Sequence, residues 1–135
     1  MRFPLVAVAL LAATHPVRVA AQAPDSIPAS AVVVEEKDLA VKPELTNRPA
    51  IARLLTRSYP RALQEEGRTG RVTVTMVIDP EGVPRLATVT GSSGVPEFDE
   101  ASLRVVRAMR FTPPVRDGQP VWVRVIVPLE FSRTP

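Results

Sequence analysis

Side chains that could do chemistry gather in one stretch of this sequence. Gly91-Ser92-Ser93-Gly94 has the composition of a phosphate-binding loop, and three carboxylates follow it, at Glu97, Asp99 and Glu100. The loop lacks the following Lys-Ser/Thr and the G-x-G-x-x-G spacing of phosphate sites, so we interpret it as a plain turn. The carboxylates fall at the start of an expected helix, where the helix dipole favours acidic residues, so we predict a capping role for them.

The residue types that other catalytic sites and metal sites need are scarce in this sequence. The chain has no cysteine, and its one histidine, His15, lies in a segment that we expect to be removed. Without a thiolate or an imidazole base, the usual nucleophilic triads and the His/Cys zinc sites cannot be assembled. We therefore predict no enzyme, no cofactor and no metal. An acid–base pair of Asp99 and Glu100 remains an alternative, and it requires both carboxylates to converge on a pocket.

Residues 1–21 have the pattern of a secretory signal peptide. Arg2 precedes the apolar run Phe3–Ala13, which is too short to span a bilayer. We predict cleavage after Ala21, with a site two residues later as the second candidate and an uncleaved membrane anchor as the alternative. Because cleavage removes Arg2, Arg18 and His15, the mature chain is nearly neutral. The basic pI of the precursor is therefore no sign of nucleic-acid binding.

A helix is expected over Phe98–Arg110, and the rest of the domain is organised around it. The residues that recur at helical spacing on its apolar face are Phe98, Ala101, Ser102, Val105, Val106 and Met109. Acidic residues in its first turn and arginines in its last suit the helix dipole. Since strand-like sequence lies on both sides, we expect this helix to form half of the core of a small α+β domain.

Three strands are predicted to pair beside this helix. Val72–Ile78 alternates with a period of two, and Asp79-Pro80-Glu81-Gly82 has the residue preferences of a type I turn. Val83–Thr90 returns from that turn, and Pro84 should keep it at a sheet edge because proline donates no ladder hydrogen bond. The longest strand, Val121–Phe131, follows the helix. A right-handed crossover then gives a three-stranded antiparallel sheet of order 2-1-3.

Two short helices are predicted before the sheet. Pro49–Arg57 has apolar residues at helical spacing, and Asn47 is well placed as its N-cap. Pro60–Glu66 looks like a second helical piece that Gly67 ends. With the last helix, these elements give the order α-β-β-α-β.

Residues 22–48 are predicted to be a disordered or extended linker, so that the domain itself spans 49–133. Proline, alanine and serine dominate the beginning of this stretch. Within it, the β-branched run Ala31–Val34 could form a strand laid on a sheet edge. We favour the linker over that strand.

In this order, the pieces of sequence resemble the C-terminal domain of TonB-type energy transducers. The matching pieces are Tyr59-Pro60, Gly67, Gly70-Arg71-Val72-Thr73-Val74, Ile78-Asp79-Pro80-Glu81-Gly82, Ser92-Ser93-Gly94, Phe98-Asp99-Glu100-Ala101, Arg110-Phe111-Thr112-Pro113, Asp117-Gly118-Gln119-Pro120-Val121 and Val127-Pro128-Leu129-Glu130-Phe131. Each piece alone is weak, whereas the ordered set is specific. The periodicity of the sequence predicts the same order of helices and strands.

The resemblance implies a binding module and not a catalyst. Domains of this family engage a short extended segment of outer-membrane receptors, the TonB box, which adds as a strand beside the domain's last strand. Main-chain hydrogen bonds then supply affinity and alternate side chains supply selectivity. The partner-binding residues that the resemblance implies here are Val121, Trp122, Val123, Arg124, Val125, Ile126 and Val127, with Tyr59 and Pro60 near the receptor-facing region. Trp122 has a second interpretation, as a residue packed under the N-terminal helix.

Full transducers of this family also carry an uncleaved transmembrane helix and a long Pro-rich spacer. Residues 22–48 reach about 90 Å even when fully extended, so we expect a periplasmic adaptor or competitor and not a carrier of force. The partner implied is a TonB-dependent outer-membrane receptor; inner-membrane motor proteins and a second copy are alternative partners. One alternative function is a structural module, in which the last strand dimerises or is capped by Ala31–Val34. The other is an uncleaved transducer anchored in the inner membrane.

Overall fold

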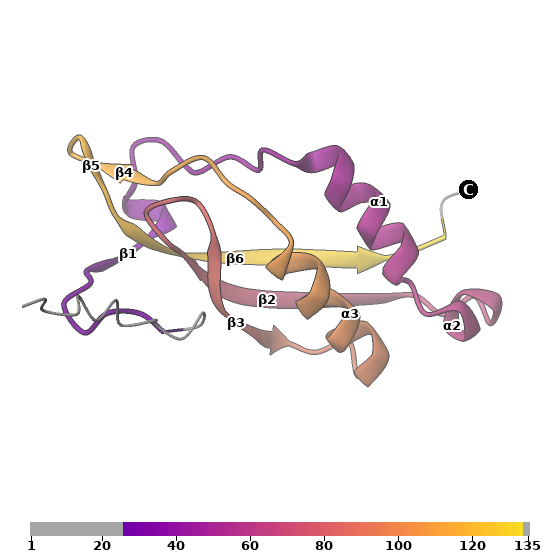
Figure 1. Ribbon diagram of the computed structural model, residues 1–135. Helices are drawn as coiled ribbons and strands as arrows, with labels where there is room; N and C mark the ends of the chain where they lie inside the picture. Colours follow the sequence, from indigo (N-terminus) through magenta and orange to yellow (C-terminus); the bar gives the residue numbers. More distant parts are fainter. Residues whose placement is uncertain (1–25, 134–135) are drawn as a thin grey trace, which may run out of the picture.

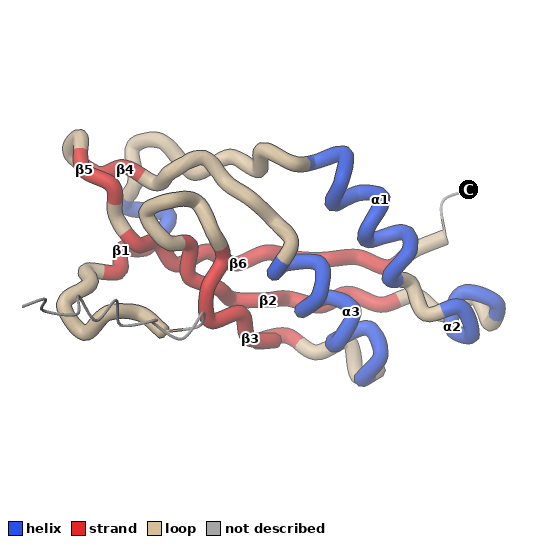
Figure 2. The backbone as a smooth tube through the Cα atoms, in the orientation of Figure 1, coloured by secondary structure: helices blue, strands red, loops and turns tan. Residues whose placement is uncertain are grey.

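The sheet has four strands, in the order β1-β6-β2-β3 (Figures 1 and 2). The computed structural model describes residues 26–133, so the predicted signal peptide lies outside the described residues. The strands of this sheet are β1 (Val33–Glu35), β2 (Gly70–Ile78), β3 (Pro84–Gly91) and β6 (Trp122–Phe131). Since β2 pairs antiparallel with both β3 and β6, the predicted α+β class and the 2-1-3 order of the three long strands are confirmed.

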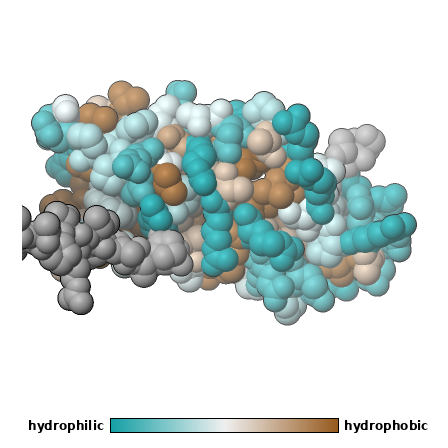
Figure 3. Space-filling model, in the orientation of Figure 1, coloured by the Kyte–Doolittle hydropathy of each residue, from teal (hydrophilic) through white to brown (hydrophobic). Residues whose placement is uncertain are grey.

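Helices and a small hairpin complete the fold. The remaining elements are η1 (Glu36–Asp38), α1 (Arg48–Ser58), α2 (Arg61–Glu65), α3 (Pro96–Arg107), β4 (Val115–Arg116) and β5 (Gln119–Pro120). The helices α1 and α3 lie on the same side of the sheet (Figure 1), and both contribute to one core. Hydrophilic side chains cover most of this side, with apolar atoms in patches between them (Figure 3). Gly67 follows α2 with φ +68°, as predicted for its end.

Asp79 closes the β2–β3 hairpin with its side chain as well as its backbone. Its carbonyl accepts a hydrogen bond from the N–H of Gly82 at 2.9 Å, which confirms the predicted turn. Its Oδ1 accepts from the N–H groups of Glu81 and Val83, both at 2.9 Å, and its Oδ2 accepts from Nε of Arg85 at 3.1 Å. These bonds hold β3 against β2. As Pro84 predicts, β3 is the outer strand on that side of the sheet.

The helix α3 covers the sheet with the face that its spacing predicts. Its buried residues are Phe98, Ala101, Ser102, Val105 and Val106. It begins and ends earlier than the predicted Phe98–Arg110. Pro96 joins the first turn because the fixed φ of proline suits that position and no backbone donor is needed there. The helix ends at Arg107, since the N–H groups of Ala108 and Met109 bond to carbonyls three residues back and the N–H of Arg110 binds the side chain of Asn47.

Three aromatic rings fill the core at one end of the sheet. Phe98 of α3 and Phe131 of β6 are stacked with their centroids 4.8 Å apart, and Tyr59 lies 5.7 Å from each. The Tyr59 hydroxyl donates a hydrogen bond to the carbonyl of Arg68. A Cβ on Gly70 would come within 2.6 Å of the Phe98 ring. The start of β2 therefore has no room for a side chain on this face.

Asn47 joins the start of α1 to the end of α3. Its Nδ2 donates to the carbonyl of Ala108 at 2.9 Å, and its Oδ1 accepts from the N–H of Arg110 at 3.0 Å. It makes no side-chain cap hydrogen bond to α1. Asn47 is thus the N-cap residue of α1, as predicted, but its side chain does not bond to the free N–H groups of that helix because both of its polar atoms are used between the two helices. The helix α1 itself agrees with the predicted Pro49–Arg57 to within one residue at each end.

The segment before α1 is folded onto the sheet. The strand β1 pairs in parallel with Trp122–Arg124 of β6. Val34 is 5% exposed and belongs to the core, as does Leu39 after η1. The linker preferred for Ala31–Val34 is therefore wrong at Val33 and Val34. A strand of three residues is too short for periodicity to distinguish it from a linker, and its partner lies far away in the sequence.

Candidate functional site

One edge of β6 carries a neighbouring strand along only part of its length. On its inner side, β2 pairs with β6 from Val123 to Phe131. On its outer side, β1 pairs with Trp122–Arg124 alone. Among residues 26–133, no strand pairs with the outer side of Val125–Phe131, which we call the open segment. An unpaired strand edge of this kind is a template for another strand.

Side chains alternate along this edge between the core and the solvent. Val123 and Val125 are buried, so their side chains contribute to the core and are not available to a partner. Arg124 and Ile126 point outward, and Ile126 is 62% exposed. Trp122 begins β6 at the end of the strand that lies away from α1 (Figure 1), so it does not pack under that helix.

Pro128 indicates which backbone groups face the outer side. A proline is tolerated in a paired strand where its nitrogen faces away from the neighbouring strand. Since β2 pairs with β6 on both sides of the Thr73–Pro128 pair, the nitrogen of Pro128 faces the open edge. Backbone groups alternate sides along a strand, so the N–H groups of Arg124, Ile126 and Glu130 face this edge too. The row of outward donors is therefore interrupted at Pro128.

Tyr59 and Pro60 do not join this edge. Tyr59 is 8% exposed and packs against Phe131, at the opposite end of β6 from Trp122 (Figure 1). Pro60 precedes α2 beside it. The predicted partner-binding residues thus lie in two places. Those from Trp122 to Val127 belong to β6, with Val121 just before it, where its N–H donates to the carbonyl of Pro114. Tyr59 and Pro60 lie at the far end of the domain.

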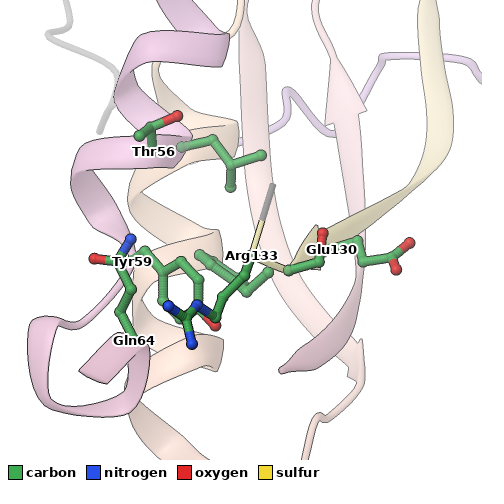
Figure 4. A pocket seen from close by; sticks show the side chains of 8 residues that line it. Thr56, Tyr59, Gln64, Glu130 and Arg133 are labelled. Atoms are coloured by element: carbon green, nitrogen blue, oxygen red, sulfur yellow. The ribbon is translucent and has the colours of Figure 1, made fainter. Parts of the chain in front are cut away.

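A cavity of about 400 Å³ opens between the end of α1 and the end of β6 (Figure 4). Its lining residues are Leu55, Thr56, Tyr59, Gln64, Glu130, Phe131, Ser132 and Arg133. The Arg133 side chain lies beside Tyr59 and Gln64 (Figure 4), whereas the Glu130 carboxylate is directed away and pairs with Arg71 at 3.3 Å. Sequence reasoning missed this cavity because its residues come from separate segments that share no motif.

Asp99 holds the loop that precedes α3. Its Oδ2 accepts from the Ser92 hydroxyl at 2.5 Å, and its Oδ1 accepts from the backbone N–H and the hydroxyl of Ser93, at 3.1 and 3.0 Å. Burial acts to raise the pKa of Asp99, but these hydrogen bonds outweigh it and the pKa lies below its usual value. The N-cap residue is Val95, without a side-chain cap bond, so Asp99 anchors a loop instead of capping the helix.

The carboxylates do not form a catalytic pair. Glu97 and Glu100 line a shallow cavity with Arg104, and Asp99 is directed to the serine loop instead. The structure therefore does not bring Asp99 and Glu100 together. Within the described part of the chain, no group of three or more His, Cys, Asp or Glu side chains is arranged to hold a metal ion.

The family described as Gram-negative bacterial TonB protein C-terminal matches residues 56–132, which is more than half of the chain. The chain belongs to this family. The protein TonB of Vibrio cholerae serotype O1 is 28% identical over 92 residues, which cover 67% of this chain and 38% of that protein. This chain thus spans about two fifths of the relative. The solution NMR structure of the Pseudomonas aeruginosa TonB C-terminal domain is similar with a TM-score of 0.50 and 28% identity, covering 57% of this chain and 78% of that one.

The TonB-family region contains the three long strands and α3, whereas β1 lies before it. The strand on the outer side of β6 therefore comes from sequence that the family match does not include. The resemblance inferred from the sequence is confirmed. None of the helices described between residues 26 and 133 has the length and hydrophobicity needed to cross a bilayer.

Proposed function

We propose that this chain is a periplasmic TonB-type binding module. It engages an extended segment of an outer-membrane receptor, the TonB box, by adding that segment as a strand to the outer side of β6, and so supports energy-coupled transport across the outer membrane. The observation that carries the proposal is the unpaired outer side of Val125–Phe131 in a TonB-family domain. Strand addition is a general mode of peptide recognition that uses such an edge.

The outward side chains of β6 indicate what such a segment contains. Ile126 is the exposed apolar residue of the edge, so an apolar side chain beside it would lose contact with water. Arg124 carries a positive charge on the same face, and a carboxylate beside it would form an ion pair. The expected partner is therefore an extended segment in which apolar and acidic residues lie near each other.

A proline substitution tests strand addition at one backbone group. Ile126→Pro removes the outward N–H of residue 126, and β6 already contains a proline in the same phase, at position 128. Ile126→Ala shortens the side chain but keeps the N–H. With a synthetic peptide of the N-terminal segment of an outer-membrane receptor, we expect Ile126→Pro to bind about tenfold more weakly than Ile126→Ala in calorimetry, since one main-chain hydrogen bond is lost.

The fold of both variants is checked by the amide exchange of β2, which pairs with the inner side of β6. Peptide-induced NMR shifts are expected at the amides from Arg124 to Glu130. Equal affinities of the proline and alanine variants would contradict strand addition at this edge. Shifts confined to the cavity around Tyr59 and Arg133 would place the peptide at the other end of the domain.

A further inference from the structure

We infer that β1 is a tethered competitor for the partner strand, which an extended partner must displace before it can pair fully with β6. This inference rests on the proposed function and adds the regulation of the same site. β1 lies on Trp122–Arg124, on the outer side of β6 where the partner would add. The outer side of Trp122–Arg124 is thus already paired with a segment of the same chain.

The open segment supplies only part of the main-chain ladder that an added strand can form. Its outward N–H groups are those of Ile126 and Glu130, and Pro128 between them has none. The uninterrupted part of the edge runs from Trp122 to Ile126, and β1 covers most of it. A partner that leaves β1 in place therefore pairs only with the part of the edge in which the N–H donor at Pro128 is missing. A partner that displaces β1 gains the continuous half of the strand.

Besides the main-chain pairing with Trp122–Arg124, three side-chain contacts hold β1 and the residues after it in place. Val34 is buried in the core, and Leu39 just after η1 is buried as well. Arg124 Nη1 lies 2.6 Å from Glu35 Oε1, with both side chains about half exposed. Because exposed ion pairs stabilise only weakly, the burial of Val34 is the stronger of the two side-chain contacts made by β1 itself. β1 has three residues, whereas the central strand β2 has nine, so its detachment leaves the rest of the sheet intact.

The side chains of β1 also indicate which partner can replace it. In β1 an apolar residue that reaches the core, Val34, is followed by a carboxylate that pairs with Arg124. A partner strand in the same parallel register would need an apolar residue followed by an acidic one to satisfy both positions. The partner class is therefore an extended, apolar and acidic segment whose chemistry resembles that of β1.

Two aspartate substitutions in the full chain test the competition. Val34→Asp buries a charge and should detach β1, whereas Val32→Asp makes the same change at a side chain that is 71% exposed and serves as the matched control. The probes are a synthetic peptide of residues 28–41 of this chain and the receptor N-terminal peptide. We expect Val34→Asp to bind both probes about tenfold more tightly than the wild type does, because the edge is free in every molecule.

Detachment is read independently from the Arg124 amide, whose exchange should quicken in Val34→Asp and slow again when the peptide of residues 28–41 is added. Glu35→Lys, which places a second positive charge beside Arg124, is the milder variant if Val34→Asp does not fold. Equal affinities of Val34→Asp and Val32→Asp for both probes would overturn the competition. Binding of the chain's own peptide without binding of the receptor peptide by any variant would uphold the capping by β1 and overturn the proposed function.

Discussion

Polar side chains in this domain add to the backbone hydrogen bonds that join neighbouring segments of the chain. Asp99 binds the loop before α3, Asp79 binds the hairpin after β2, and Asn47 binds the residues after α3. Carboxylates and amides at helix and turn boundaries are expected to act locally, as caps and turn formers. Asp79 does so, whereas Asn47 acts between helices that are distant in the sequence. The residue type therefore predicts that such a side chain lies at a helix or turn boundary, but it does not predict which group the side chain bonds to.

Asp99 makes a pH-dependent contribution to stability. Because its pKa is lowered in the folded state, the ionised form stabilises the fold at neutral pH, and this contribution is lost as the pH falls through the folded pKa. We expect Asp99→Asn to lower the free energy of unfolding by about 1 kcal/mol at pH 7, since its hydrogen bonds to Ser92 and Ser93 weaken. Urea denaturation should show this difference shrinking between pH 5 and pH 2, roughly the range in which such a carboxylate becomes protonated.

The control for Asp99→Asn is Glu100→Gln, which removes a negative charge from an exposed position of the same helix. It separates the effect of net charge from that of the bonds to the serine loop. An unfolding free-energy difference between wild type and Asp99→Asn that is the same at pH 7 and pH 2 would contradict the role of the ionised carboxylate.

At the level of elements, the long strands and α3 could be predicted because each carries its own periodicity. The buried face of α3 and the alternation of β2 and β6 are local patterns. Such a pattern can be recognised in the sequence without knowing which distant residues the element will contact. The strand β1 could not be predicted in the same way, because three residues hold no period. Its position depends on a partner at the other end of the chain.

In the candidate site, too, the features with local periodicity could be predicted, and those that depend on distant contacts could not. The predicted edge strand was identified correctly as an element, since β6 is long and alternating and follows the family pattern. Its partial cover by β1 and the cavity around Tyr59 depend on contacts between distant segments. The aromatic character of Tyr59 fits recognition and core packing equally well, and only the stacked rings of Phe98 and Phe131 distinguish the two.

The bridge made by Asn47 can be distinguished from a helix cap by one substitution. Aspartate is as good an N-cap as asparagine, but it cannot donate a hydrogen bond to the carbonyl of Ala108. We expect Asn47→Asp to lower the free energy of unfolding by about 1 to 2 kcal/mol in urea denaturation at pH 7, close to the loss in Asn47→Ala. A stability of Asn47→Asp equal to that of the wild type would contradict the bridge between the side chain and the end of α3.

At the level of the whole molecule, the strands of the sheet differ in how many residues pair them with their neighbours. The strand β2 has a neighbour on each side, and its core residues Val72, Val74, Met76 and Ile78 are fully buried. β1 is attached at one edge through three residues. Among the strands of this sheet, opening should therefore start at β1, because it pairs over the fewest residues.

Native-state hydrogen exchange should record this order. We expect β2 amides to exchange only through global unfolding, and amides of β1 to exchange at least about tenfold faster through local detachment. Exchange is measured residue by residue by NMR as denaturant is added, with β3, the other outer strand, as the internal comparison. Exchange of β1 as slow as that of β2 would show that β1 leaves only when the domain unfolds, and it would count against the displacement that we infer.

The proline in β6 has a consequence for the solubility of the protein in a crowded compartment. A long unbroken strand edge invites identical chains to stack one upon another into fibrils. Here the edge is interrupted at Pro128 and carries charged side chains at Arg124 and Glu130. A short visiting strand can pair with the first half of the edge, but the ladder has no continuous row of donors along which copies of the whole domain could grow. The same residue that limits the length of the proposed binding site thus makes this edge of the sheet a poor template for self-assembly.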